Sequence, residues 1–280
     1  NPSRLLRHIL SIILVGVVLL PIITRAKFSP EMGLFPSEWE KTNQAIQSIP
    51  AGSPLLVVFD YDPALAGELE VAASPVINHF LALDAHLALI STNPTGPALG
   101  EKFLDNIRPA YPALHLAYTN LGYLAGGPTG MSLFSTDPRQ AVAQAVDGKP
   151  AWDVPALTGI HHLADFGAVI ILTDNADTGR LWIEQTRASI GNTPLLMVVS
   201  AQAEPMIRPY FDSGQIQGLI SGLMGGKTYE QTYATPGLAR HYWDTFGIGI
   251  MTTVILITVG SIWSAVKSLS ARKKAGLEKP

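Results

Sequence analysis

The feature that most constrains this chain is an uncharged stretch, Thr245 to Val266, which is long enough to cross a lipid bilayer as a helix. Trp243 and Trp263 lie near its two ends, where aromatic side chains favour the membrane interface. A buried core helix of this length would normally keep one polar face. We therefore predict a transmembrane helix at 245–266.

A second uncharged stretch, Ile9 to Thr24, lies near the start of the chain. It is short for a span, which needs about 20 apolar residues. A cleaved signal peptide is the alternative, but the stretch runs into Ile-Ile-Thr-Arg-Ala-Lys, which lacks a small-x-small cleavage site. We favour an uncleaved second transmembrane helix at 9–24.

Basic residues on one side of the stretch 245–266 predict the orientation of the chain. They follow it at Lys267, Arg272, Lys273, Lys274 and Lys279. On the other side, Arg240 is neutralised by Asp244. By the positive-inside rule, residues 267–280 form a basic cytoplasmic tail. Two spans then return residues 1–8 to the cytoplasm, so we expect a two-pass protein of the cell (inner) membrane with an extracytoplasmic domain.

Composition excludes several classes of function. The net charge of −3 gives no electrostatic basis for binding nucleic acid, which requires a clustered basic surface. The chain has no cysteine, which removes disulfides, thiolate nucleophiles and cysteine-ligated metals. We expect the lipid bilayer as a partner, and neither a nucleic-acid partner nor a cofactor.

The region between the two stretches is predicted to be a connector with a short helix, residues 25–49, followed by one domain, residues 50–235. Short apolar runs typical of buried strands occupy 54–60, 87–91, 114–118, 167–173, 195–200 and, at an edge, 216–220. Helical patterns fall at 64–83, 98–107, 178–190 and 204–211, and a loop with a short helix near 139–145 is expected within the Gly- and Pro-rich segment 120–155.

Strands that alternate with helices imply a parallel sheet with right-handed crossovers. We therefore predict a doubly wound (Rossmann- or flavodoxin-like) three-layer α/β sandwich of five or six strands, flanked by the two transmembrane helices.

Polar residues at the expected strand ends are the candidate ligand-binding site, because open parallel sheets bind ligands beyond the carboxyl ends of their strands. They are Asp60, Asp62, Thr92, Asn93, Thr119, Asn120, Thr173, Asp174, Asn175 and Ser200. Helix capping is the simpler explanation for Asp, Asn, Ser and Thr at such positions. The functional hypothesis is a crevice for a small polar ligand, with Asp60 and Asp174 as its acidic walls.

Enzyme motifs are weak in this sequence. Asp60-Tyr61-Asp62 resembles the paired aspartates of haloacid-dehalogenase-type phosphotransferases, and Thr173 their phosphate-binding threonine, but no lysine stands at a suitable strand end. The segment 221–228 resembles the second half of a P-loop, yet Ser221 stands where glycine or alanine is required, so a Gly-rich turn is expected.

Metal and serine-nucleophile sites are also not expected. The adjacent His161 and His162 point in different directions on a helix or strand and lack a third ligand. No G-x-S-x-G motif occurs. We therefore predict no catalytic residues and no metal site. The Gly-rich segment 120–127 is open to two interpretations, a bare loop or a close approach of the backbone to a ligand or partner.

Three segments carry a resemblance to a known family. They are Pro50-Ala-Gly-Ser53 leading into the strand that ends Phe59-Asp-Tyr61, then Asn120-Leu-Gly-Tyr123, and then Pro209 to Gln215 running into Gly218 to Gly226. Together they resemble an uncharacterised family of bacterial and archaeal membrane-anchored α/β proteins, over most of residues 37–230. The family has no established activity, so the resemblance supports the architecture alone. Its members carry glycine where this chain has Asp62, which weakens the paired-aspartate hypothesis.

Two classes of function follow from these observations. The first is a membrane-anchored, non-enzymatic module that binds a ligand or partner, such as a membrane protein or a second copy of the chain, or acts as a scaffold. The alternative is a phosphatase-like hydrolase that uses the strand-end carboxylates. The missing catalytic constellation favours the first.

Overall fold

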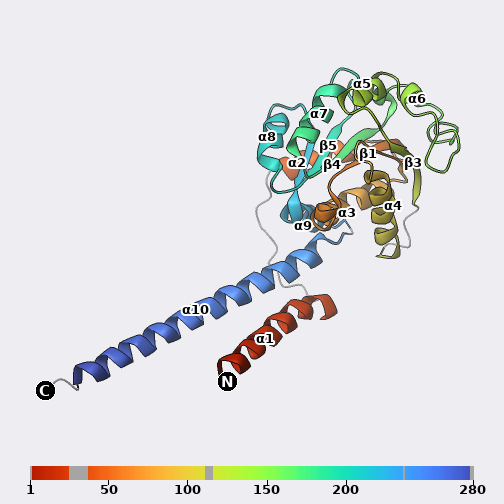
Figure 1. Ribbon diagram of the computed structural model, residues 1–280. Helices are drawn as coiled ribbons and strands as arrows, with labels where there is room; N and C mark the ends of the chain where they lie inside the picture. Colours follow the sequence, from red (N-terminus) through yellow and green to blue (C-terminus); the bar gives the residue numbers. More distant parts are fainter. Residues whose placement is uncertain (1, 25–36, 111–115, 236, 278–280) are drawn as a thin grey trace. The chain divides into compact units, whose positions relative to one another are not determined.

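The computed structural model describes residues 2–24, 37–110, 116–235 and 237–277 (Figure 1). The chain divides into two compact units. One is an α/β domain within Glu31–Arg240, and the other is a helical unit formed by Asn1–Pro30 and His241–Pro280. Of the connector predicted at 25–49, residues 25–36 lie outside the described residues, and the rest contains a helix, as predicted.

A six-stranded parallel sheet forms the centre of the domain, in the order β3-β2-β1-β4-β5-β6. The strands are β1 Pro54–Asp60, β2 His86–Ser91, β3 Ala117–Tyr123, β4 Ala168–Thr173, β5 Leu195–Val199 and β6 Gly218–Ser221. The chain moves outward from β1 to β3 and then returns to β4 on the other side of β1. This is the Rossmann-like order, and it places the switch point between β1 and β4.

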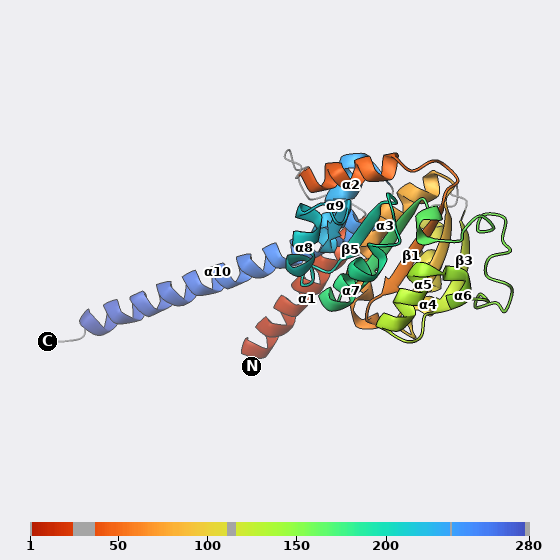
Figure 2. The ribbon, with the colours of Figure 1, turned by 90° about the horizontal axis from the view of Figure 1, so that it is seen from above.

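Side chains that alternate along each strand build two cores, one on each face of the sheet. Along β1, Leu55, Val57 and Phe59 enter the first core, whereas Leu56 and Val58 enter the second. Four helices contribute to the first core: α2 Ser37–Gln47, α3 Ala66–Ala82, α4 Gly96–Ile107 and α9 Gly222–Tyr233. The second core is covered by α5 Pro128–Thr136, α7 Ala176–Thr186 and α8 Glu204–Asp212 (Figure 2).

Short helical turns complete the domain, namely η1 Pro63–Leu65, η2 Arg108–Ala110, α6 Pro138–Ala141 and η3 Leu163–Asp165. The prediction of an α/β domain with a parallel sheet between helices is confirmed. The long helix predicted at 64–83 is η1 followed by α3, and Pro63 stands at the first position of that turn, where it removes no helical hydrogen bond.

The third strand differs from its prediction. It begins at Ala117 and continues to Tyr123, whereas the sequence suggested 114–118, of which 114 and 115 lie outside the described residues. A bulge after Asn120 makes the extension possible: the pairing with β2 shifts there, and Gly122 takes a φ of +90°. Because the glycines look like loop residues, the sequence pattern does not reveal this part of the strand.

One further local prediction is confirmed with different bounds, and another is wrong. The helix near 139–145 is the shorter α6, and the chain then forms a hairpin over 143–151, closed by an antiparallel bridge between Gln144 and Pro150. The segment 221–228 opens α9 instead of forming a turn. A Cβ at Gly226 would lie 2.6 Å from Ala72 Cα, so this glycine serves the close packing of α9 on α3.

The helical unit consists of α1 Pro2–Thr24 and α10 Ala239–Leu277. In the part of the chain that the structure describes, α10 alone is long and apolar enough to cross a membrane, over Ala239–Ser268. The apolar stretch of α1, Arg7–Leu20, is shorter than the about 20 residues that a span requires. The structure therefore gives one candidate span where the sequence suggested two.

Candidate binding site

The carboxylate of Asp60, at the end of β1, is buried and bonded inside the domain. One oxygen accepts from Ser91 Oγ (2.7 Å), Thr92 N (2.6 Å) and Asn93 N (3.3 Å). The other accepts from Thr92 Oγ1 and Trp182 Nε1, both at 2.6 Å. Removing a carboxylate from water costs free energy, and hydrogen bonds to both of its oxygens offset that cost.

These bonds give Asp60 a structural role. It links β1 to the loop after β2 and to α7, across the switch point where Rossmann-like domains usually bind ligands. Trp182, which is fully buried, completes the network. The sequence did not point to this tryptophan, because an aromatic residue on a helix ordinarily belongs to the core.

Local bonds to the next turn account for three of the strand-end residues. Asp62 and Asn175 cap η1 and α7, whose first N–H groups would otherwise be unpaired, and Asn93 bonds to Thr95, the residue before α4. The pairs are Asp62 with Ala64 N (2.7 Å), Asn93 with Thr95 N (3.1 Å), and Asn175 with Asp177 N (2.9 Å) and Thr178 N (3.1 Å).

One hydrogen bond closes the turn after β4, and another joins this turn to the residue after β5. Thr173 Oγ1 accepts from Asn175 N at 3.1 Å, and Ser200 Oγ donates to Asp174 O at 3.2 Å. Thr173 and Ser200 are fully buried, whereas Asp174 is partly exposed. Among the described residues, no three His, Cys, Asp or Glu side chains are grouped as a metal site requires.

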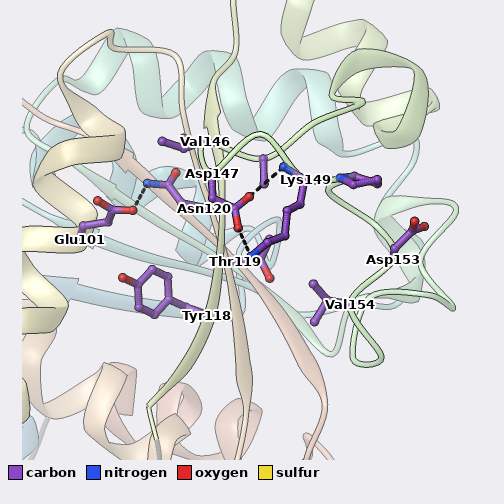
Figure 3. Close-up of a pocket in the computed structure, with 11 residues that line it drawn as sticks. Glu101, Tyr118, Thr119, Asn120, Val146, Asp147, Lys149, Asp153 and Val154 are labelled. Atoms are coloured by element: carbon purple, nitrogen blue, oxygen red, sulfur yellow. Dashed lines mark hydrogen bonds and ion pairs between the residues drawn. The ribbon is translucent and has the colours of Figure 1, made fainter.

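A pocket of about 520 Å³ lies beside β3, which is an edge strand of the sheet (Figure 3). Its lining residues come from α4, from β3 and from the 143–154 segment: Glu101, Tyr118, Thr119, Asn120, Ala145, Val146, Asp147, Lys149, Pro150, Asp153 and Val154. The structure thus brings Thr119 and Asn120 of the predicted set to this pocket and separates them from the ends of β1 and β4.

The α4 side of the pocket is held by Asn120. Its Nδ2 donates to Glu101 Oε1 at 2.9 Å and to Pro97 O at 3.2 Å, and its Oδ1 accepts from Gly122 N at 3.0 Å. Asn120 therefore positions Glu101 and stabilises the bulge. Burial, followed by the negative charges of Glu101 and Asp105, raises the pKa of Tyr118 above its usual value.

The 143–151 hairpin forms the other side of the pocket. Ala145 N donates to Lys149 O at 2.9 Å, and Trp152 Nε1 anchors the base by donating to Val142 O at 2.6 Å. At the tip, Asp147 Oδ2 and Lys149 Nζ form an exposed ion pair at 2.9 Å. The hydrogen bond from the Lys149 side chain lowers the pKa of Asp147.

Carboxylates give the pocket a negative character. Three of its lining residues are acidic, Glu101, Asp147 and Asp153, against the single cation Lys149, which is paired with Asp147. Figure 3 shows Glu101 on one side of β3 and Asp153 on the other. Such a pocket favours a cationic group over an anion such as phosphate.

Sequence reasoning missed most of this site, because its residues lie on a helix, a strand and a hairpin that only the fold brings together. The available signal was the Gly- and Pro-rich segment 120–155, for which an approach to a ligand or partner was one of two interpretations. No family model, no curated protein and no solved structure matches this chain. The resemblance to the uncharacterised membrane-anchored family therefore stays a prediction.

Proposed function

We propose that this chain is a membrane-anchored binding module that uses the pocket beside β3 to hold a partner protein. The observation that carries the proposal is the acidic pocket of about 520 Å³ at an edge of the sheet. A pocket with a few convergent polar groups is the usual form of a recognition site.

The state of Asp60 favours a binding module over the phosphatase-like hydrolase. A nucleophilic or metal-binding carboxylate must present an oxygen to the substrate or metal. Both oxygens of Asp60 instead accept from protein donors at 2.6 Å, and the side chain is buried. Asp62 next to it is engaged in capping η1.

Anchoring is proposed to occur through α10. Its apolar stretch Ala239–Ser268 has the required length, and the Lys267 ammonium lies 5.6 Å from the ring centre of Trp263, a pairing suited to a membrane interface. By the positive-inside rule, the basic residues after Lys267 support a cytoplasmic C-terminus and an α/β domain outside the cytoplasm. We propose α1 as a second, shorter membrane helix.

Photo-crosslinking in native membranes tests the binding module. A photoreactive phenylalanine analogue replaces Val146, which is 58% exposed at the pocket, or Met206, which is 49% exposed on α8. The two positions are similarly accessible, so non-specific reaction should affect both. We expect a discrete adduct from position 146 alone, and we expect Asp153→Lys to reduce it.

Two outcomes would contradict the proposal. Position 146 could give no adduct, or both positions could give the same adducts in the same yield. An adduct whose mass is that of two copies of this chain would identify the partner as a second copy.

A further inference from the structure

The two edges of the sheet are protected to different extents. At β6, Thr42 Oγ1 of α2 accepts from Leu219 N at 3.1 Å, so a helix covers this edge. At β3, the 143–151 hairpin supplies one bond, from Val146 N to Asn120 O at 2.9 Å. An uncovered strand edge is a template for pairing with another chain.

Tyr118 presents main-chain groups at this uncovered part of the edge. Along a strand, the N–H and C=O groups of alternate residues point to the same side. Because Asn120 O points outward to the hairpin, Tyr118, two residues earlier, directs its N–H and C=O outward as well. Among the residues that the structure describes, no backbone hydrogen bond joins either group to a partner outside the sheet.

The pocket lies against this edge, since Tyr118, Thr119 and Asn120 all line it. A segment added beside β3 would therefore enter the pocket. Its side chains would alternate between the two faces of the sheet, as in any strand.

Each face offers negative charge to such a segment. Toward α4, a side chain would meet Glu101 and the ring of Tyr118, and the next side chain would meet Asp153 and Asp147 on the hairpin side (Figure 3). The pair between Asp147 and Lys149 is exposed and contributes little stability, so a ligand cation can replace Lys149 there.

We propose that β3 binds an extended segment of a partner protein by strand addition, and that this segment carries two adjacent basic residues. The main-chain groups of Tyr118 would set the register, and the carboxylates on the two faces would select the lysine or arginine side chains. This inference rests on the proposed function, because it names the partner of the same pocket.

Fluorescence anisotropy with the full chain in detergent micelles tests the inference. The probe is a labelled six-residue peptide of threonine and valine with lysine and arginine at its two central positions. Two control peptides are compared with it. The first carries glutamates at the two central positions, and the second keeps the basic pair but has N-methylated central amides. We expect each control to bind on the order of tenfold more weakly, because one loses the charges and the other the main-chain bonds.

Matched protein variants locate the binding. Glu101→Gln with Asp153→Asn should weaken the basic peptide on the order of tenfold. Glu184→Gln with Asp212→Asn removes the same charge from exposed sites on α7 and α8 outside the pocket lining, and it should leave binding unchanged. Glutamine at 101 retains the oxygen that accepts from Asn120.

Several outcomes would overturn the inference. The basic peptide could fail to bind, the N-methylated peptide could bind equally well, or free lysine amide could bind as tightly as the peptide, which would identify a small-amine pocket. If position 146 still captures a partner while the peptides fail, strand addition is wrong and the binding module stands. If both experiments fail, both proposals are wrong.

Discussion

Asp60 and Asp62 stand two positions apart at the end of the same strand, yet their carboxylates have different surroundings. Asp60 is 4% exposed and accepts from five donors, whereas Asp62 is exposed and, within the described part of the chain, accepts from Ala64 N alone. The sequence treats both as strand-end acids. Their burial assigns one to the interior and the other to a turn.

Asp60→Asn should lower the free energy of unfolding by about 3 kcal/mol, because an amide nitrogen would face buried donors and the charge-assisted bonds would be lost. Asp62→Asn should change it by less than about 0.5 kcal/mol, since asparagine caps a turn as well as aspartate does. Denaturant unfolding of the full chain in micelles measures both. Equal losses would contradict the structural role of Asp60.

His79 on α3 connects stability to pH. Its Nδ1 lies 2.8 Å from Tyr229 Oη on α9, and burial lowers the pKa of His79 below its usual value. A lowered pKa means that the unfolded chain takes up this proton first as the pH falls. The contribution of His79 is therefore fully present above the unfolded pKa of about 6.5, and it is lost as the pH falls toward the folded value.

Thermal unfolding of the wild type and of His79→Gln checks this sign. The wild type should lose more stability than the variant as the pH falls below about 6.5. Glu70→Gln tests the reverse case. Burial raises the pKa of Glu70, so the contribution of this side chain to stability is present at low pH and is lost as the pH rises through the folded pKa. Identical pH profiles for wild type and His79→Gln would show that His79 does not titrate across folding.

At the scale of the elements, the start of α4 is fixed by contact with strand ends. A Cβ at Gly96 would lie 1.9 Å from Ser91 Oγ and 2.3 Å from Phe59 O. Gly96→Ala should therefore destabilise the domain by about 1–3 kcal/mol, as overpacking does. In contrast, a Cβ at Gly67 in α3 has nothing within 4 Å, so Gly67→Ala should stabilise by about 0.5–1 kcal/mol through helix propensity. Unfolding temperatures that move in the same direction would refute this comparison.

The elements also differ in how far their sequences determine them. The apolar run 54–60 has the same bounds as β1, because both of its faces are buried and periodicity is not needed to recognise it. The part of β3 after Tyr118 and the start of α9 look like loop and turn in the sequence, because their glycines serve a bulge and close helix packing. A glycine in a sequence indicates conformational freedom of the backbone. Whether it instead serves a close contact is seen only from the residues that surround it in the folded structure.

At the scale of the whole molecule, the absence of cysteine makes orientation measurable, since each introduced cysteine is unique. Ser132 is exposed on α5, and Ser270 follows the apolar stretch of α10. With a membrane-impermeant maleimide, Ser132→Cys should react in intact cells, and Ser270→Cys only after permeabilisation. The opposite pattern would place the domain in the cytoplasm.

A third variant, Ser3→Cys, distinguishes one span from two. If α1 also crosses the membrane, this cysteine shares the cytoplasm with Ser270→Cys and is protected in intact cells. If α10 crosses alone, it reacts as Ser132→Cys does. Labelling of lysed cells controls for reactivity at each position.

Of the site, the sequence supplied only Thr119 and Asn120, which lie in the pocket, along with strand-end residues that the structure uses for capping and for the Asp60 network. Glu101 and Asp153 carry no shared local pattern, because they are 52 positions apart and lie on different elements of the fold.

The apolar helix of α10 and the alternation of strands and helices follow from the sequence alone, because hydrophobic length and periodicity are local properties of a chain. The folded structure sets which strand-end acid is buried, which edge of the sheet is less covered and where carboxylates gather into a pocket. These three features depend on contacts between residues far apart in the chain, and such contacts form only when the strands pair in their final order.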